Sequence, residues 1–152
     1  MINENDFVIF LDVDGVLNKE SDWNKKYYVD KNCVACLQKI IQLINKKKYT
    51  AKIVLSSTWR AGMGATSESL QILELKKQLA AFGIEIADAT PVSNQGRQRE
   101  VLYYIRKHNV SNYLIIDDDE SLFEDIGKLH FYKPDYKTGL TLQDVKKVKK
   151  ML

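Results

Sequence analysis

The stretch LDVDGVLN, residues Leu11 to Asn18, indicates the fold of this chain. It ends the apolar run FVIFL and places Asp12 and Asp14 two positions apart, with Gly15 directly after them. Neighbouring carboxylates at a strand end repel each other and lose hydration, which costs stability unless a cation or a reaction needs them. Glycine allows a tight turn at this point. A solvated Asp-Gly turn is the plain alternative.

Around this stretch, short apolar runs alternate with helical patterns along the whole chain. This alternation predicts an α/β, Rossmann-like fold, with a mostly parallel sheet and helices on both faces. The expected strands are residues 7–13, 52–56, 83–87, 113–117 and 129–132. The expected helices are residues 32–46, 67–82, 97–108 and a last one that begins at Thr141, where Thr141 and Asp144 form a capping-box pattern. We expect residues 1–152 to form one domain.

Polar side chains follow two further strands of this predicted sheet. In an open α/β sheet, ligands bind at the carboxyl ends of the strands, so these residues are candidate site residues. The run IVLSSTWR offers the hydroxyls of Ser56 and Ser57, which can donate hydrogen bonds to phosphate, followed by Trp59 and Arg60. The alternative is that Ser57 or Thr58 only caps the start of a helix.

The run YLIIDDD ends a later strand with Asp117, Asp118 and a third aspartate. Adjacent carboxylates at a strand end favour a hard cation, and magnesium prefers such oxygen ligands. A solvated acidic turn is the alternative. Between these strands, Arg97 and Arg99 stand at a predicted helix start, where a guanidinium can hold a phosphoryl group. We expect one of the two to be ordinary surface.

These four elements together resemble the haloacid dehalogenase (HAD) phosphohydrolase superfamily. Its pattern is a strand with DxDG, a strand ending in Ser or Thr, a Lys or Arg, and an acidic strand end. LDVDGVLN, IVLSS, the arginine pair and IIDDD occur in that order. The motifs VDGVLN, SSTWR, GRQRE, DDD and GLT are more narrowly similar to HAD domains associated with RNA-repair proteins. The chain departs from the common pattern in having arginine instead of lysine, and DDD instead of GDxxxD.

The resemblance implies a magnesium-dependent phosphatase that works through an aspartyl phosphate. Asp12 is then the nucleophile and Asp14 the general acid and base, while Ser56 and Arg97 or Arg99 hold the phosphoryl oxygens. Magnesium is held by Asp12, the Asp14 carbonyl and the acidic fourth motif. There Asp118 aligns with the metal ligand, and Asp117 takes the position of the glycine.

The spacing of the motifs also bears on the substrate. A predicted helix takes up much of the interval between Asp14 and Ser57, which leaves room for a small flap at residues 19–29 but for no cap domain. By resemblance, an open site of this kind serves large substrates. We expect a phosphorylated nucleic-acid end, with a 3′-phosphate, where Trp59 stacks on a base and Arg60 pairs with a phosphate. Lysine clusters at residues 46–48 and 146–150 would contact the backbone. The alternatives are that Trp59 is core, that Arg60 holds the aspartates, and that the chain is a small-molecule phosphatase.

Composition sets further bounds. The net charge of +3 is too small to indicate nucleic-acid binding by itself. No apolar run is long enough to span a bilayer and no leader pattern is present, so we expect a cytoplasmic protein without membrane contacts. Cys33 and Cys36 fall on the apolar stripe of the first helix, which predicts buried, reduced thiols; a redox pair or half a zinc site is the alternative.

Two rival functions belong to other classes of protein. A receiver-type signalling domain also combines aspartates, a hydroxyl and a basic residue around magnesium. Its acidic pair lies at the first strand and its phosphoacceptor at the third, whereas here DxDG comes first and DDD fourth. The other rival is a metal-dependent module that binds phosphorylated partners without turnover, and phosphomonoester hydrolysis would distinguish it from an enzyme.

Overall fold

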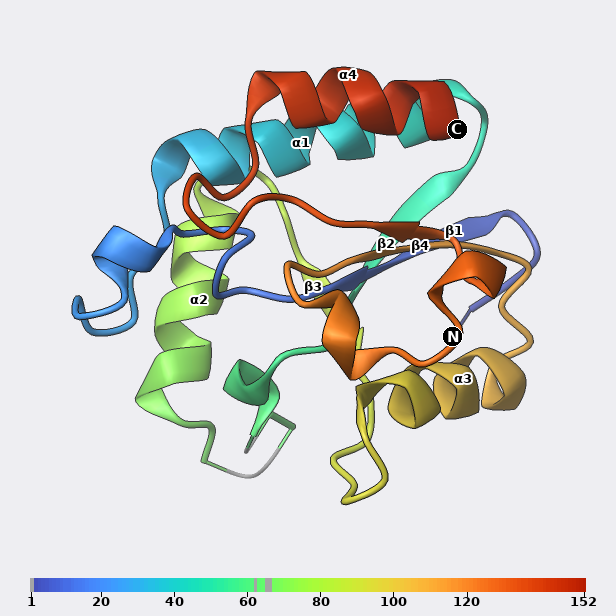
Figure 1. The fold of residues 1–152 in the computed structure, drawn as a ribbon, viewed down its shortest axis with the longest axis horizontal. Coiled ribbons are helices and arrows are strands. Elements are labelled where there is room, and N and C mark those ends of the chain that lie inside the picture. The colour runs from blue at the N-terminus through green and yellow to red at the C-terminus, as the bar shows by residue number, and fades with distance from the viewer. Residues whose placement is uncertain (1, 62, 65–66) are drawn as a thin grey trace.

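The computed structural model describes residues 2–61, 63–64 and 67–152. Across these residues, five strands form one sheet in the order β3-β2-β1-β4-β5, and every neighbouring pair is parallel (Figure 1). The strands are β1 (Asp6–Leu11), β2 (Thr50–Leu55), β3 (Ile86–Ala89), β4 (Asn112–Ile116) and β5 (Phe131–Tyr132). The predicted parallel sheet is therefore confirmed.

Helices cover both faces of the sheet. They are α1 (Lys31–Lys46), α2 (Leu70–Ala80), α3 (Arg97–Lys107) and α4 (Leu142–Met151). In Figure 1, α4 lies along α1 on one side of the sheet and α3 lies on the other side. Residues of α1, α2 and α4 share one core cluster with Ile9 and Leu11, while Tyr104 of α3 packs with Phe10 in a second cluster. The α/β, Rossmann-like architecture is confirmed.

The buried strands and helix caps follow from the sequence. Residues 8–11 of β1 are fully buried because helices cover the sheet on both faces, so these four residues are all apolar instead of alternating with polar ones. The Asp30 side chain caps α1 by accepting a hydrogen bond from the Asn32 backbone N–H. At α4, Thr141 and Asp144 make both hydrogen bonds of the predicted capping box.

Some boundaries differ from the expected ones. Helix α2 begins after Ser69, which caps it, instead of at residue 67. The third strand begins at Ile86 rather than at residue 83, because the N–H of Ile84 still donates to the Leu79 carbonyl as part of the turn that ends α2. Strand β5 has two residues where four were expected.

No cap domain occurs among the described residues. The chain between β1 and β2 consists of a loop and α1, and residues 19–29 form a short segment with one 3-10 turn at Glu20–Asp22. This agrees with the expected small flap. In the described residues, loops and short 3-10 turns follow β1, β2 and β4 at the carboxyl edge of the sheet.

Two further predictions concern the state of the cysteines and the presence of membrane-spanning helices. Cys33 and Cys36 are both buried on α1 and neither is in a disulfide in the described structure, as predicted. Burial raises the pKa of the Cys33 thiol to about 12, which makes it a poor nucleophile. Every helix in the described ranges is too short or too polar to cross a bilayer.

Candidate active site

The candidate site residues follow the three central strands. Asp12 comes directly after β1, Ser56 after β2, and Asp117 after β4. The Asp12 N–H donates to the Ile116 carbonyl at 3.0 Å, and the Ser56 N–H donates to the Leu11 carbonyl at 2.8 Å. These bonds extend the parallel ladders to the strand ends, so the three side chains start from one edge of the sheet.

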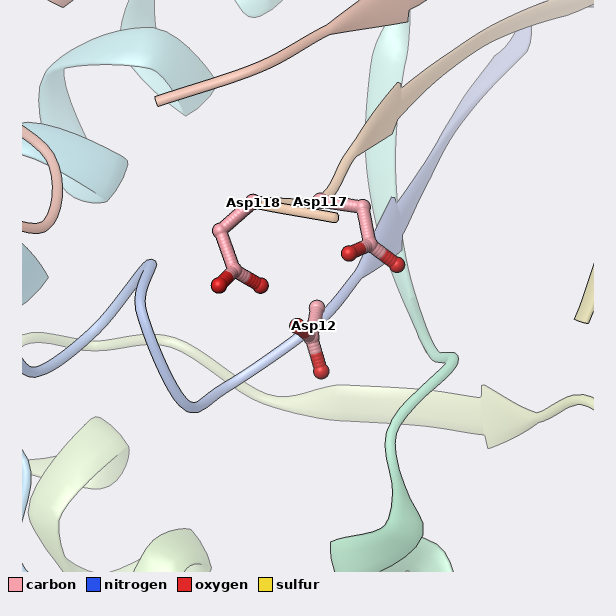
Figure 2. Close-up of side chains that lie close together, drawn as sticks. All are labelled: Asp12, Asp117 and Asp118. Carbon is pink, nitrogen blue, oxygen red and sulfur yellow. The ribbon is translucent and has the colours of Figure 1, made fainter. Parts of the chain in front are cut away.

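Three carboxyl groups meet at this edge. Asp12, Asp117 and Asp118 each offer an oxygen, and these oxygens all lie within 4.8 Å of one another. Figure 2 shows Asp12 and the two later aspartates around a common space, one reached from β1 and the others from β4. Carboxylate oxygens at this separation suit a hard divalent cation such as magnesium. The donor set therefore fits the metal that the sequence predicts.

Gly15 lets the loop after β1 pass close to this cluster. Its φ is +82°, and a Cβ atom built on it would lie 2.4 Å from Oδ2 of Asp118. Both the backbone conformation and the contact exclude a larger residue without movement of Asp118. The glycine of the DxDG motif thus makes room for the third carboxylate.

The ionised carboxyl groups of this cluster repel one another. Burial and then the charge of Asp117 raise the pKa of Asp12 well above its usual value. Burial also raises the pKa of Asp117, although the Arg97 guanidinium opposes the shift. Two close carboxyl groups that resist ionisation are stabilised by a cation, so the electrostatics favour bound metal.

Arg97 is the arginine that reaches the cluster. Its Nη1 lies 2.7 Å from Oδ2 of Asp117 and 3.6 Å from Oδ1 of Asp12. Arg99, two residues further along α3, is exposed. The structure therefore places Arg97 at the site and Arg99 on the surface.

Both oxygens of the Asp14 carboxylate are held by side chains. Asn18 Nδ2 donates to Oδ1 at 2.9 Å, and Trp59 Nε1 donates to Oδ2 at 3.1 Å. Asn18 is itself fixed, because its Oδ1 accepts from the Gly15 N–H and from Trp23 Nε1. Sequence reasoning missed this network, although Asn18 lies within the quoted motif.

The two serines after β2 differ in their partners. The Ser57 hydroxyl accepts from the Trp59 N–H and so caps a 3-10 turn, as the alternative interpretation held. The Ser56 Oγ is buried and has no hydrogen-bond partner among the described residues. Leaving a buried hydroxyl unpaired costs about 1–3 kcal/mol. An oxygen of a bound phosphoryl group would satisfy it.

The expected substrate contacts of Trp59 and Arg60 are wrong. Trp59 is only 4% exposed and has no free ring face for a base. The Arg60 guanidinium is buried and bonds to the carbonyls of Ser57 and Thr90 and to Glu100. Trp59 instead positions Asp14, and Arg60 ties the loop after β2 to α3.

The lysine clusters also lie elsewhere than expected. Lys46 ends α1 just before β2 begins, and Lys47 Nζ donates to the carbonyl oxygen of Leu152 just beyond α4. Both helix ends are therefore at the edge where strands begin, opposite the edge where the aspartates lie. The clusters do not adjoin the site.

Comparison with known proteins identifies one family. A family model described as "HAD domain in Swiss Army Knife RNA repair proteins" matches residues 8–145. The matched range includes the acidic cluster, Ser56 and Arg97. No curated protein matches the chain.

Proposed function

The chain belongs to the family of HAD domains in Swiss Army Knife RNA repair proteins, and on this basis we propose that it is a magnesium-dependent phosphomonoesterase with an aspartyl-phosphate intermediate. The family supports phosphatase-type hydrolysis in general. The observation that carries the finer proposal is the meeting of Asp12, Asp118 and Arg97 at the carboxyl edge of the sheet.

The nucleophile in this proposal is Asp12. A carboxylate oxygen of Asp12 attacks phosphorus in line, the bond from phosphorus to the leaving oxygen breaks, and Asp14 donates a proton to that oxygen. Asp14 then takes a proton from a water that attacks the same phosphorus, and the bond from phosphorus to the Asp12 oxygen breaks. The second step releases inorganic phosphate and regenerates both carboxyl groups.

Asp12, Asp118 and the Asp14 carbonyl would hold the magnesium ion. When bound, the ion offsets the repulsion between the attacking carboxylate and the phosphate. Asp117 has a different part in the proposal, since its two carboxylate oxygens already accept from Arg97 and from the Asp119 N–H. We assign it to holding Arg97 in place.

Two further groups stabilise the transferred phosphoryl group in this scheme. Arg97 is a fixed cation 3.6 Å from the nucleophile, and Ser56 is a buried hydroxyl donor without another partner in the described structure. Donors held in place before the reaction stabilise the charge that develops on the phosphoryl oxygens. Ser57, which caps a turn, is left to contribute its backbone.

For the substrate we propose a phosphorylated nucleic-acid end, namely a 3′-phosphate. The absence of a cap among the described residues leaves the edge open to a polymer end. The description of the family points to RNA repair. A small-molecule phosphatase of the same fold is the alternative, and it predicts no preference for an oligonucleotide over a sugar phosphate.

Turnover of simple phosphomonoesters tests the enzyme proposal. We expect hydrolysis that stops on chelation and returns with magnesium. Asp12→Asn should reduce the rate by about a thousandfold or more, because an amide cannot act as the nucleophile. Arg97→Ala should slow the reaction by about a hundredfold.

Arg99→Ala is the matched control for Arg97→Ala, since it removes the same charge from an exposed position of the same helix. Near-native turnover by Asp12→Asn would sink the covalent mechanism. Restoration by zinc but not by magnesium would refute the assigned metal.

A further inference from the structure

Two exposed aromatic rings stack on each other beside the loop that carries Asp14. Trp23 is 46% exposed and Tyr136 is 37% exposed, with ring centroids 6.1 Å apart and planes inclined by 29°. They come from the segment that follows β1 and the segment that leads into α4, coloured blue and red in Figure 1. The Glu20 N–H donates to the Tyr136 carbonyl at 3.0 Å and joins the two segments.

The aromatic pair is connected to the proposed proton donor, Asp14, through one intervening residue, Asn18. Trp23 Nε1 donates to Oδ1 of Asn18 at 2.9 Å, and Asn18 Nδ2 donates to Oδ1 of Asp14 at 2.9 Å. A general acid must contact the oxygen that leaves. The organic part of the substrate is attached to that oxygen, so it lies beside Asp14, whose carboxylate is linked through Asn18 to Trp23.

A hollow of about 350 Å³ beside Arg97 is the competing place for the organic group. It is lined by Thr58, Gly96 and Leu122 among others, but by neither Asp14 nor Asn18. A group in that hollow would adjoin the residue that holds the phosphoryl oxygens, not the residue that protonates the leaving oxygen. The geometry of the reaction therefore favours the aromatic pair.

The chemistry around the pair indicates what it binds. Exposed tryptophan and tyrosine faces bind planar groups by stacking, and every nucleobase offers such a face. Four exposed lysines stand close to the two rings in the sequence: Lys25, Lys26, Lys133 and Lys137. Lys25 and Lys133 are paired with Asp22 and Glu120, and Glu20 and Asp135 also stand beside the two rings in the sequence, so positive and negative charges are mixed around the pair.

We propose that Trp23 and Tyr136 form the subsite for the terminal base of a single-stranded nucleic-acid end whose 3′-phosphate is hydrolysed at Asp12. This inference rests on the proposed function and assigns its substrate specificity to two named residues. Their indole and phenol rings supply the stacking surface that Trp59, being buried, cannot.

The experiment compares the native protein with Trp23→Ala on three substrates in magnesium. These are a short single-stranded RNA with a 3′-phosphate, the same RNA ending in an abasic 3′-phosphorylated residue, and glycerol phosphate. We expect Trp23→Ala to lower the ratio of kcat/KM for RNA to that for glycerol phosphate by at least about fivefold. The abasic RNA should show no such change.

Three further variants test whether the ring of Trp23 itself is required. Trp23→Phe keeps a ring but loses the N–H to Asn18, so it should retain most of the RNA preference. Tyr103→Ala removes another exposed tyrosine, on α3, and should leave the ratio unchanged. A lower ratio in Leu122→Ala but not in Trp23→Ala would place the base in the hollow beside Arg97 and overturn the proposal.

A binding measurement separates this inference from the proposed function. Non-phosphorylated RNA of the same sequence should quench tryptophan fluorescence in the native protein but not in Trp23→Phe, whether or not any phosphomonoester is hydrolysed. Absence of turnover with quenching intact would reject the enzyme and keep the base subsite. Normal RNA turnover with no effect of Trp23→Ala would reject the subsite alone.

Discussion

At the scale of single residues, Asp14 is held by side chains from two separate parts of the chain. Asn18 comes from its own loop and Trp59 from the loop after β2, and each donates one N–H to a different carboxylate oxygen. A carboxyl group with both oxygens fixed presents its proton in one direction. Loss of either donor should impair proton transfer more than it impairs phosphoryl binding.

Trp59→Phe tests this arrangement through the choice of leaving group. Protonation matters most when the leaving oxygen is strongly basic, so we expect roughly a tenfold loss of kcat with alkyl phosphates. Nitrophenyl phosphate, whose leaving group needs little protonation, should lose much less. Asp14→Asn should show the same pattern more strongly. Equal losses on both kinds of ester would mean that Trp59 only supports the fold.

Asp12 has a second testable property, since its burial beside Asp117 makes its charge costly. A carboxyl group whose pKa is raised in the folded state holds its proton more tightly there than in the unfolded state. Its contribution to stability is therefore lost as the pH rises above the ordinary value of 3.8 and toward the raised one. Without metal, the native protein should lose stability over this range.

Asp12→Asn removes that charge while keeping the shape of the side chain. With a chelator present near neutral pH, we expect the free energy of unfolding in urea to be higher for this variant than for the native protein. The difference should be on the order of 1 kcal/mol. The difference should shrink toward pH 4 and on addition of magnesium. Glu85→Gln, at an exposed position, is the control. A variant less stable than the native protein in chelator would contradict the charge conflict.

At the scale of elements, the loop after β1 carries Asp12 and Asp14, the proposed nucleophile and proton donor, and passes close to Asp118. Its turn depends on Gly15, where both the positive φ and the approach of Asp118 exclude a side chain. The same loop carries Asn18 and, further on, Trp23. One segment thus carries the proposed nucleophile, the proposed general acid and one residue of the proposed base subsite.

Gly15→Ala should therefore affect metal binding beyond its effect on the backbone. The added Cβ must displace Asp118, so we expect a clearly higher magnesium concentration for half-maximal turnover, together with a stability loss of about 1–2 kcal/mol. Gly83→Ala is a matched control, because φ there is +71° but nothing lies within 4 Å of the added atom. It should lose similar stability and keep the native magnesium response.

At the scale of the whole molecule, two groups of lysines differ in their place relative to the site. The lysines of the α1 and α4 termini lie where strands begin, whereas Lys133 and Lys137 flank Tyr136 in the sequence. Of these two groups, the second flanks a residue of the proposed base subsite. Net charge alone, at +3, does not distinguish these positions.

The salt dependence of catalysis should distinguish the two groups. Binding of a polymer releases counterions, so kcat/KM for the 3′-phosphorylated RNA should fall steeply with salt, and that for glycerol phosphate only mildly. Lys133→Gln with Lys137→Gln should flatten the dependence by roughly one or two charges. Lys149→Gln with Lys150→Gln, at the far end, should not. Equal salt responses of both substrates would favour a small-molecule phosphatase.

The sequence by itself determined the parallel sheet, the lack of a cap between its motifs, and the acidic strand ends. These features are local or periodic, because a strand covered on both faces is apolar throughout and polar residues mark where it stops. The placement of Asp12, Ser56 and Asp118 at one edge follows once the strands are known to be parallel.

Three features were decided only by the tertiary structure. Arg97, not Arg99, lies at the site; Trp59 is buried; and Asn18 is hydrogen-bonded to Asp14. Two residues apart on a helix, the arginines point about 200° apart, so one faces Asp117 and the other solvent, depending on how α3 packs. Trp59 reads equally well as a binding residue or as core until the loop after β2 is placed against Asp14. These contacts join segments far apart in the sequence, and their geometry depends on packing that no local pattern contains.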